Sequence, residues 1–299
     1  MPQTVIENPI LNSPFAEPGR HFRFSDEGIT NEIVDERRTS TYFVPIPASK
    51  KKSKQLALQV TEWTQDRVKP NDFINDVRGY VDTWRKGGYR DVTTTTRQLL
   101  DYWRDPDRDR KLFFCQIEAL ETAIFIAEVA PKYHPNVITQ LRAFNDASNP
   151  LLYRVALKMA TGAGKTVVMA MLIAWQALNK LANPQDARFS DAFLIVTPGI
   201  TIRDRLRVLL PNDPQNYYRE RDVLPSELLV ELGKAKIIIA NFHGFTLRDP
   251  GDASRLTKSI LARGGESPTK ETSGAMVRRV CRELGNKKNI IVINDEAHH

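Results

Sequence analysis

The segment RVALKMATGAGKT, residues 154–166, is followed by a run of Ala, Val, Leu and Met that extends to Trp175. We expect a strand over Arg154–Met159, a turn of small residues over 160–166, and then a helix. Such a turn directs backbone N–H groups inward, and the helix N-terminus adds a partial positive charge, so the two together attract anions. Gly162 and Gly164 let the backbone approach phosphates without Cβ clashes. The segment therefore predicts a nucleotide phosphate site.

The turn also supplies side chains for a triphosphate and its metal ion. Lys165 is expected to reach the β and γ phosphates of ATP, and the Thr166 hydroxyl to ligate Mg²⁺. A Gly-Lys-Thr sequence that occurred by chance in a surface turn would lack the flanking strand and helix pattern. The strict P-loop pattern has Gly where this chain has Met159. The predicted nucleotide-binding residues of the turn are Ala160, Thr161, Gly162, Ala163, Gly164, Lys165 and Thr166.

Composition places the chain among ordinary globular proteins. Its 299 residues are 41% hydrophobic and 26% charged, which is enough for one large core or two smaller ones. The net charge of +7 is compatible with a nucleic-acid partner without identifying one. Cys115 and Cys281 form no disulfide or metal pattern and are expected to be buried thiols. No apolar run has the length of a membrane span, and we expect a cytoplasmic location.

Three regions are predicted along the chain. Residues 1–54 are rich in Pro and should form an extended arm with one short hairpin, with strands at His21–Ser25 and Tyr42–Ile46. Residues 55–110 should be helical, because apolar residues recur at helical spacing after Asn71-Asp72 and again after the threonine run that begins at Thr93. Residues 111–299 should form an α/β domain with a parallel sheet. The segment between Arg248 and Thr272 is expected to be a mobile insertion.

The strands of the α/β domain deliver polar residues to one edge. Besides residues 154–159, we expect strands at Ala192–Thr197, Lys236–Ala240 and Asn289–Asn294. The last strand ends in Asp295-Glu296, and ligands of open α/β sheets bind at the carboxyl ends of the strands. Asp295 is expected to hold Mg²⁺, and Glu296 to orient or deprotonate the attacking water.

Together these motifs resemble a known family. Ala160–Thr166 with Asp295-Glu-Ala-His298 is similar to the superfamily-two helicases and translocases, and Met159–Thr166 resembles the motor of type III restriction endonuclease Res subunits and their DEAD/DEAH-box relatives. Asn8–Phe15, Arg20–Phe22, Leu112–Thr122 and Thr197–Arg205 extend the resemblance over nearly the whole chain. It implies a RecA-like P-loop fold, ATP and Mg²⁺ as cofactors, and DNA, in double-stranded form, as the partner. It also implies a methyltransferase subunit as a further partner.

The resemblance adds roles for individual residues. From the residues alone, Gln116 is as well explained as a polar helix-start residue as it is by contact with the adenine edge, and Phe114 as a core ring as by stacking on the base. The family favours the adenine assignment for both. It places Thr197, Pro198 and Gly199 on the nucleic-acid side, where Arg203 would add a phosphate contact. Asn241 and His243 are weaker candidates for the same groove, and His298 would link the two sites.

The expected activity is ATP hydrolysis coupled to DNA unwinding or translocation. A second RecA-like domain with its arginine finger is not recognisable, nor is a nuclease motif, so we expect an N-terminal piece of a longer protein that binds ATP but hydrolyses it poorly. Alternatives that stay open are an RNA helicase, a P-loop kinase or nucleotide-switch module, and a truncated gene product without catalysis.

Overall fold

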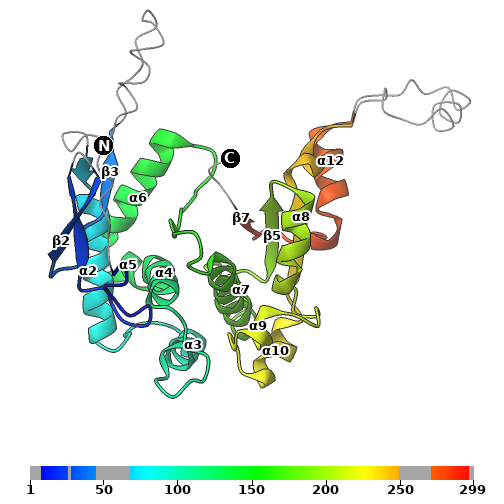
Figure 1. Cartoon of the computed structure of the whole chain (residues 1–299). Helices are drawn as coiled ribbons and strands as arrows, with labels where there is room; N and C mark the ends of the chain where they lie inside the picture. The colour runs from blue at the N-terminus through cyan, green and yellow to red at the C-terminus, as the bar shows by residue number, and fades with distance from the viewer. Residues whose placement is uncertain (1–7, 26–27, 45–67, 249–270, 296–299) are drawn as a thin grey trace, which may run out of the picture. The chain divides into compact units, whose positions relative to one another are not determined.

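The computed structural model describes residues 8–25, 28–44, 68–248 and 271–295. Within them the chain forms two compact units (Figure 1). Unit 1 comprises residues up to Val92 together with Lys111–Ala163, and unit 2 comprises Thr93–Arg110 together with the residues from Gly164 onward. The predicted helical region, residues 55–110, is divided between the two units at 92/93. The expected mobile insertion lies almost entirely outside the described residues.

Unit 1 contains two small antiparallel sheets and a group of helices. Strand β1 (His21–Ser25), which was predicted, pairs with β2 (Gly28–Val34), which was not predicted. Strand β3 (Thr41–Phe43) pairs with β4 (Val68–Pro70), a strand that the sequence pattern did not predict. The helices are α2 (Asp72–Lys86), α4 (Phe114–Ile124), the π-helical turn η2 (Phe125–Val129), α5 (Ala130–Tyr133) and α6 (Pro135–Ser148).

Local signals explain helix α2. The Asn71 side chain accepts a hydrogen bond from the backbone N–H of Ile74 at 3.4 Å, which satisfies one donor of the first turn. Val77, Val81 and Trp84 are buried along one face, at the spacing that the sequence predicted. The predicted helix and its start after Asn71 are therefore confirmed.

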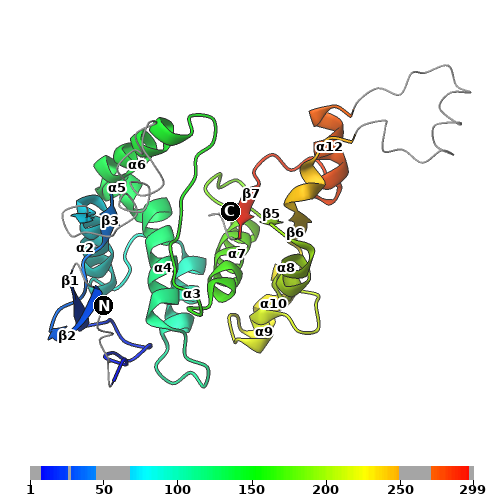
Figure 2. The same ribbon diagram turned by 45° about the horizontal axis from the view of Figure 1, so that its top comes forward.

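Unit 2 is built on a three-stranded parallel sheet. Its order is β6 (Lys236–Asn241), β5 (Ala192–Thr197), β7 (Ile291–Asn294), which Figure 2 shows side by side. The helical elements are α3 (Thr94–Arg104), α7 (Lys165–Ala182), α8 (Ile200–Arg205), η3 (Leu206–Leu209), α9 (Tyr217–Glu220), α10 (Ser226–Leu232), η4 (Phe242–Phe245), α12 (Ser273–Val280) and η6 (Arg282–Leu284). The mixed α/β composition and the parallel sheet are compatible with the predicted RecA-like class.

Strand β5 is the centre of this sheet. Phe193 and Ile195 are fully buried on one face, whereas Ala192 and Leu194 pack with Ala240 and Leu284 on the other. A short apolar run buried on both faces is typical of an internal parallel strand.

Helix α3 belongs to unit 2 because a buried polar junction joins it to α7. The Thr96 hydroxyl accepts hydrogen bonds from the indole Nε1 of Trp175 at 3.0 Å and from Nδ2 of Asn179 at 2.9 Å. The Thr93 hydroxyl caps α3 through the backbone N–H of Thr96 and also contacts the side-chain oxygen of Asn179. Thr96 and Asn179 are fully buried, so these polar groups depend on one another for hydrogen bonds.

Two expectations are not met. Residues 154–159 form no strand: the segment has no regular secondary structure, and Val155 is 47% exposed. An extended segment gains stability only from a neighbouring strand, and this one pairs with none of the described strands. The buried-thiol prediction is wrong for Cys115, which is exposed because it occupies the solvent side of the first turn of α4.

The junction gives a stability prediction. Thr96→Val keeps the side-chain shape but leaves the Trp175 indole N–H without its acceptor, so the free energy of unfolding should fall by about 1–3 kcal/mol. A lower midpoint in urea unfolding would measure this loss. Thr94→Val changes an exposed position of the same helix and should leave the midpoint unchanged. An equal decrease in both variants would contradict the role of the Thr96 hydroxyl.

Candidate functional site

The turn before α7 has the backbone conformation that a phosphate-binding loop needs. Gly162 and Gly164 both have φ of +80°, in the left-handed region that favours glycine. The backbone N–H of Ala163 donates to the Ala160 carbonyl at 3.2 Å and closes the turn. No atom comes within 4 Å of a Cβ built on Gly162, so its backbone conformation, and not crowding, requires glycine there.

Helix α7 starts directly at this turn. Gly164 is its N-cap residue, and its carbonyl accepts hydrogen bonds from the backbone N–H groups of Val167 at 2.9 Å and Val168 at 3.3 Å. Lys165 and Thr166 occupy the first turn and are half-buried. The Thr166 hydroxyl makes no hydrogen bond to any residue that the structure describes. A helix N-terminus with a lysine and an available hydroxyl fits the chemistry of a triphosphate and Mg²⁺.

Gln116 connects the start of α4 to the same turn. Its Oε1 accepts a hydrogen bond from the backbone N–H of Phe113 at 2.9 Å, and its Nε2 donates to the Ala163 carbonyl at 3.0 Å. The side chain is 5% exposed. Both ends of the amide are therefore engaged within unit 1, and contact with an adenine edge would require exchanging one of these bonds. No feature of the sequence pattern indicated the Ala163 carbonyl as the partner of Gln116.

Phe114 lies beneath two arginines. The guanidinium carbons of Arg85 and Arg37 lie 5.1 and 5.6 Å from its ring centroid, and the residue is 8% exposed. A base stacked on this ring would have to displace a guanidinium group. Phe15 and Phe113, whose ring centroids are 5.6 Å apart, are the more exposed aromatic pair at the start of α4.

The arginines over Phe114 are held by carboxylates. Arg85 contacts the fully buried Glu121 at 2.6 Å, and Arg37 contacts Glu118 at 2.6 Å. Desolvation opposes the charge of Arg85, but its hydrogen bond to Glu121 and the charge of that carboxylate outweigh desolvation and raise the arginine pKa. The ion pairs therefore keep the two guanidinium groups above the Phe114 ring charged and hold them in position.

The carboxyl ends of the three parallel strands meet at one edge of the sheet. Thr197 is opposite Asn241 in the register, and Val196 is opposite Asn294. The backbone N–H of Asp295 donates to the Val196 carbonyl at 3.1 Å, so Asp295 follows β7 directly at this edge. The structure thus brings the predicted Mg²⁺ ligand Asp295 to the edge that ligands of open α/β sheets use. Glu296 and His298 lie outside the described residues.

A pocket of about 540 Å³ lies at the same edge, around the predicted nucleic-acid residues. It is lined by Pro198, Gly199, Ile200, Arg203, Asn241, His243 and Gly244. The pocket joins the turn after β5 to the turn after β6, as the parallel register requires. Ile200 and Gly244 were not predicted, although their positions directly after these strands were a signal for them.

The polar groups around this pocket differ in availability. Thr197 is fully buried, and its hydroxyl donates to the Gly199 carbonyl at 3.1 Å, so it shapes the turn. The Arg203 guanidinium contacts only the exposed Asp204 at 3.2 Å among the described residues. An exposed ion pair of this kind is weak and can be exchanged for a phosphate.

These features define a class of protein. A glycine turn with left-handed residues at the start of a helix, and a parallel sheet whose last strand is followed by Asp295, are compatible with a RecA-like nucleotide-binding domain. Over residues 111–299 the chain matches the family model described as type III restriction enzyme, Res subunit, and it belongs to that family. The matched region is a helicase-like, ATP-binding motor domain of the DEAD/DEAH type.

Other comparisons add no further relatives. No curated protein and no solved structure matches the chain. None of the helices in the described part is long and apolar enough to cross a membrane.

The contacts of Gln116 give a testable consequence. Gln116→Glu keeps an oxygen for the Phe113 N–H but places a second oxygen against the Ala163 carbonyl. Amide exchange in residues 160–166 should then increase about tenfold, since a hydrogen bond contributes about 1–1.5 kcal/mol, whereas exchange at the start of α4 should not change. Hydrogen-exchange mass spectrometry measures both. Gln140→Glu, an exposed position of α6, is the control, and unchanged exchange in the turn would refute the contact.

Proposed function

We propose that this chain is the first motor domain of a DNA-dependent ATPase that works as a helicase or translocase in a type III restriction-like subunit. The observation that carries the proposal is the pair of left-handed glycines, Gly162 and Gly164, directly before α7. The family membership supports ATP as the nucleotide and DNA as the partner. A methyltransferase subunit is the partner protein that this family suggests.

The proposed reaction is phosphoryl transfer from ATP to water. Lys165 and the backbone N–H groups of residues 160–166 neutralise the β and γ phosphates. Thr166 and Asp295 would hold Mg²⁺, which would supply charge neutralisation at the transferred phosphate. Glu296 orients and deprotonates the attacking water, and His298 connects the ATP site to the DNA site.

Adenine recognition is assigned to the start of α4. Gln116 contacts the adenine edge after exchanging one of its present hydrogen bonds, and this exchange would signal nucleotide binding to the turn through Ala163. Phe114 stays the predicted stacking residue. The greater exposure of Phe15 and Phe113 makes that pair the competing platform.

DNA contact is assigned to the pocket at the carboxyl edge of the sheet. Pro198 and Gly199 present backbone groups to a phosphate, and Arg203 adds a charge. Thr197 contributes by holding the turn through Gly199.

The phosphate assignment is tested at Lys165. Lys165→Ala should weaken binding of a fluorescent ATP analogue with Mg²⁺ at least tenfold, because a hydrogen bond to a charged group contributes about 1.5–3 kcal/mol. Lys180→Ala removes the same charge at the other end of α7 and should leave the affinity unchanged. Unchanged affinity in Lys165→Ala would disprove the phosphate site.

The DNA assignment is tested at Arg203. Arg203→Ala should weaken duplex binding similarly for different sequences and reduce the salt slope of log K by about 1, as expected for the loss of one phosphate contact. Arg219→Ala, an exposed arginine on α9, serves as the control. Titrations of duplex, single-stranded DNA and RNA over several salt concentrations, with ATPase rates alongside, would also reveal an RNA-dependent enzyme. An identical slope in both variants would exclude Arg203 from the interface.

A further inference from the structure

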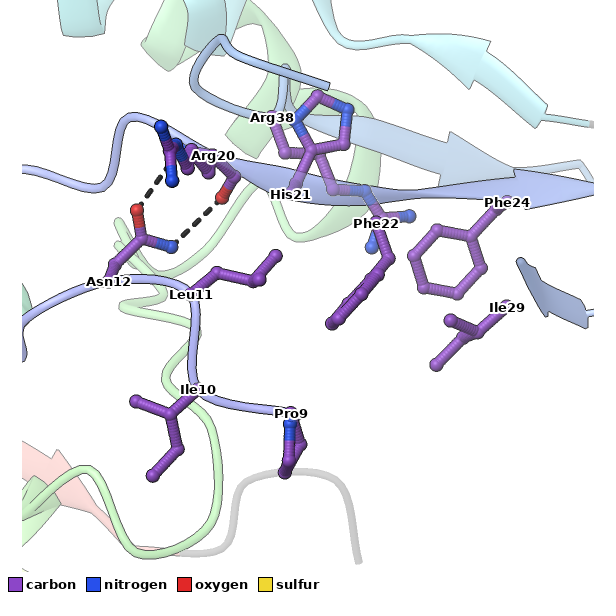
Figure 3. Close-up of a pocket in the computed structure, with 10 residues that line it drawn as sticks. All are labelled: Pro9, Ile10, Leu11, Asn12, Arg20, His21, Phe22, Phe24, Ile29 and Arg38. Atoms are coloured by element: carbon purple, nitrogen blue, oxygen red, sulfur yellow. Dashed lines mark hydrogen bonds between the residues drawn. The ribbon is translucent and has the colours of Figure 1, made fainter. Parts of the chain in front are cut away.

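Unit 1 contains a cavity of about 440 Å³ between residues 9–12 and the β1–β2 hairpin (Figure 3). Pro9, Ile10 and Leu11 of the arm line one side, and Phe22 and Phe24 of β1 line the other. The cavity lies outside residues 111–299, so the family match assigns it no role.

The wall of this cavity is held by the Asn12 side chain. Its Nδ2 donates to the Arg20 carbonyl at 2.9 Å, and its Oδ1 accepts from the backbone N–H groups of Gly19 and Arg20, both at 3.0 Å. These three hydrogen bonds join residue 12 to residues 19 and 20, directly before β1. The cavity is therefore formed before any ligand arrives, which reduces the entropy cost of binding.

The lining is cationic and aromatic. The guanidinium carbon of Arg38 lies 4.2 Å from the ring centroid of Phe24, and no carboxylate of the described residues pairs with Arg38. Arg20 is the second arginine of the lining, and its Nε contacts the exposed Asp35 at 2.8 Å. The lining contains no acidic residue. A ligand that fits must offer flat apolar faces together with negative charge.

We propose that this cavity binds an unpaired stretch of polynucleotide. One base stacks on Phe22 or on the outer face of the Arg38 guanidinium, and a neighbouring phosphate contacts Arg38 or Arg20. Bases within a duplex cover one another's faces, so the aromatic lining selects unpaired nucleotides. The proposal rests on the proposed nucleic-acid function. It adds a second contact site, which binds single-stranded polynucleotide instead of duplex.

The test uses the full chain and a fluorescein-labelled oligothymidylate. Phe22→Leu should weaken binding about fivefold or more, since stacking contributes about 1–3 kcal/mol per base. Arg38→Gln should weaken binding and reduce the salt slope by about 0.7. Arg23→Gln is the control, because Arg23 lies on the same strand but contacts Glu32 at 3.0 Å and does not line the cavity.

Two further experiments distinguish between the possible outcomes. Cross-linking of a bromodeoxyuridine oligonucleotide to the unmodified chain should label the peptide that contains Phe22. This experiment uses no variant, so its result does not depend on whether the variants fold. Oligouridylate in place of oligothymidylate identifies RNA or DNA as the source of the strand. Equal affinity for duplex, equal losses in Arg23→Gln and Arg38→Gln, or cross-links only elsewhere would overturn the proposal.

The proposed function can stand when this proposal fails. Affinity for Mg²⁺–ATP should be unchanged in Phe22→Leu and Arg38→Gln, whereas it should be lost in Lys165→Ala. Phe22→Leu and Arg38→Gln could bind single strands as the unmodified chain does while Arg203→Ala still weakens duplex binding. In that case only the assignment of the cavity is refuted.

Discussion

The Thr96 hydroxyl is the acceptor on which the arrangement of unit 2 depends. Two buried donors from α7 converge on it, and the cost of leaving such donors without an acceptor makes separation of α3 from α7 unfavourable. Helix α7 carries the predicted phosphate ligands Lys165 and Thr166 on its first turn. The helix is held in place by Thr96, which precedes its partners Trp175 and Asn179 by 79 and 83 residues in the sequence.

A second dependence links the start of α4 to the phosphate turn. The Gln116 amide satisfies its own helix N-terminus with one end and the Ala163 carbonyl with the other. A nucleotide that competes for this amide would therefore change the hydrogen bonding of the turn as well as that of the helix. Under the proposed function, adenine binding at Gln116 would therefore alter the hydrogen bonding of the predicted phosphate turn.

Features that depend on neighbouring residues could be predicted from the sequence. Asn71 as a cap, the spacing of Val77, Val81 and Trp84, and the glycine turn before α7 are all encoded within a few residues of where they act. The sequence also predicted that Asp295 follows the last strand at its carboxyl end, and its backbone N–H lies there, bonded to the Val196 carbonyl of β5.

Features that depend on distant partners could not be predicted in this way. Residues 154–159 have strand-like composition, but a strand forms only where another strand accepts it. The apolar context of Cys115 suggested burial, yet the orientation of α4 leaves that thiol exposed. Phe114 was expected to face a base, and only the three-dimensional structure revealed Arg37 and Arg85 above its ring.

The chain passes between the two units at 92/93, at 110/111 and at 163/164. Domain boundaries taken from the family match would therefore divide a structural unit. A recombinant protein that began at residue 111 would retain α7 but lose α3, which would remove the Thr96 acceptor from both Trp175 and Asn179. Gene fusions, limited proteolysis and domain exchange between relatives should accordingly treat residues 93–110 as an inseparable part of the motor.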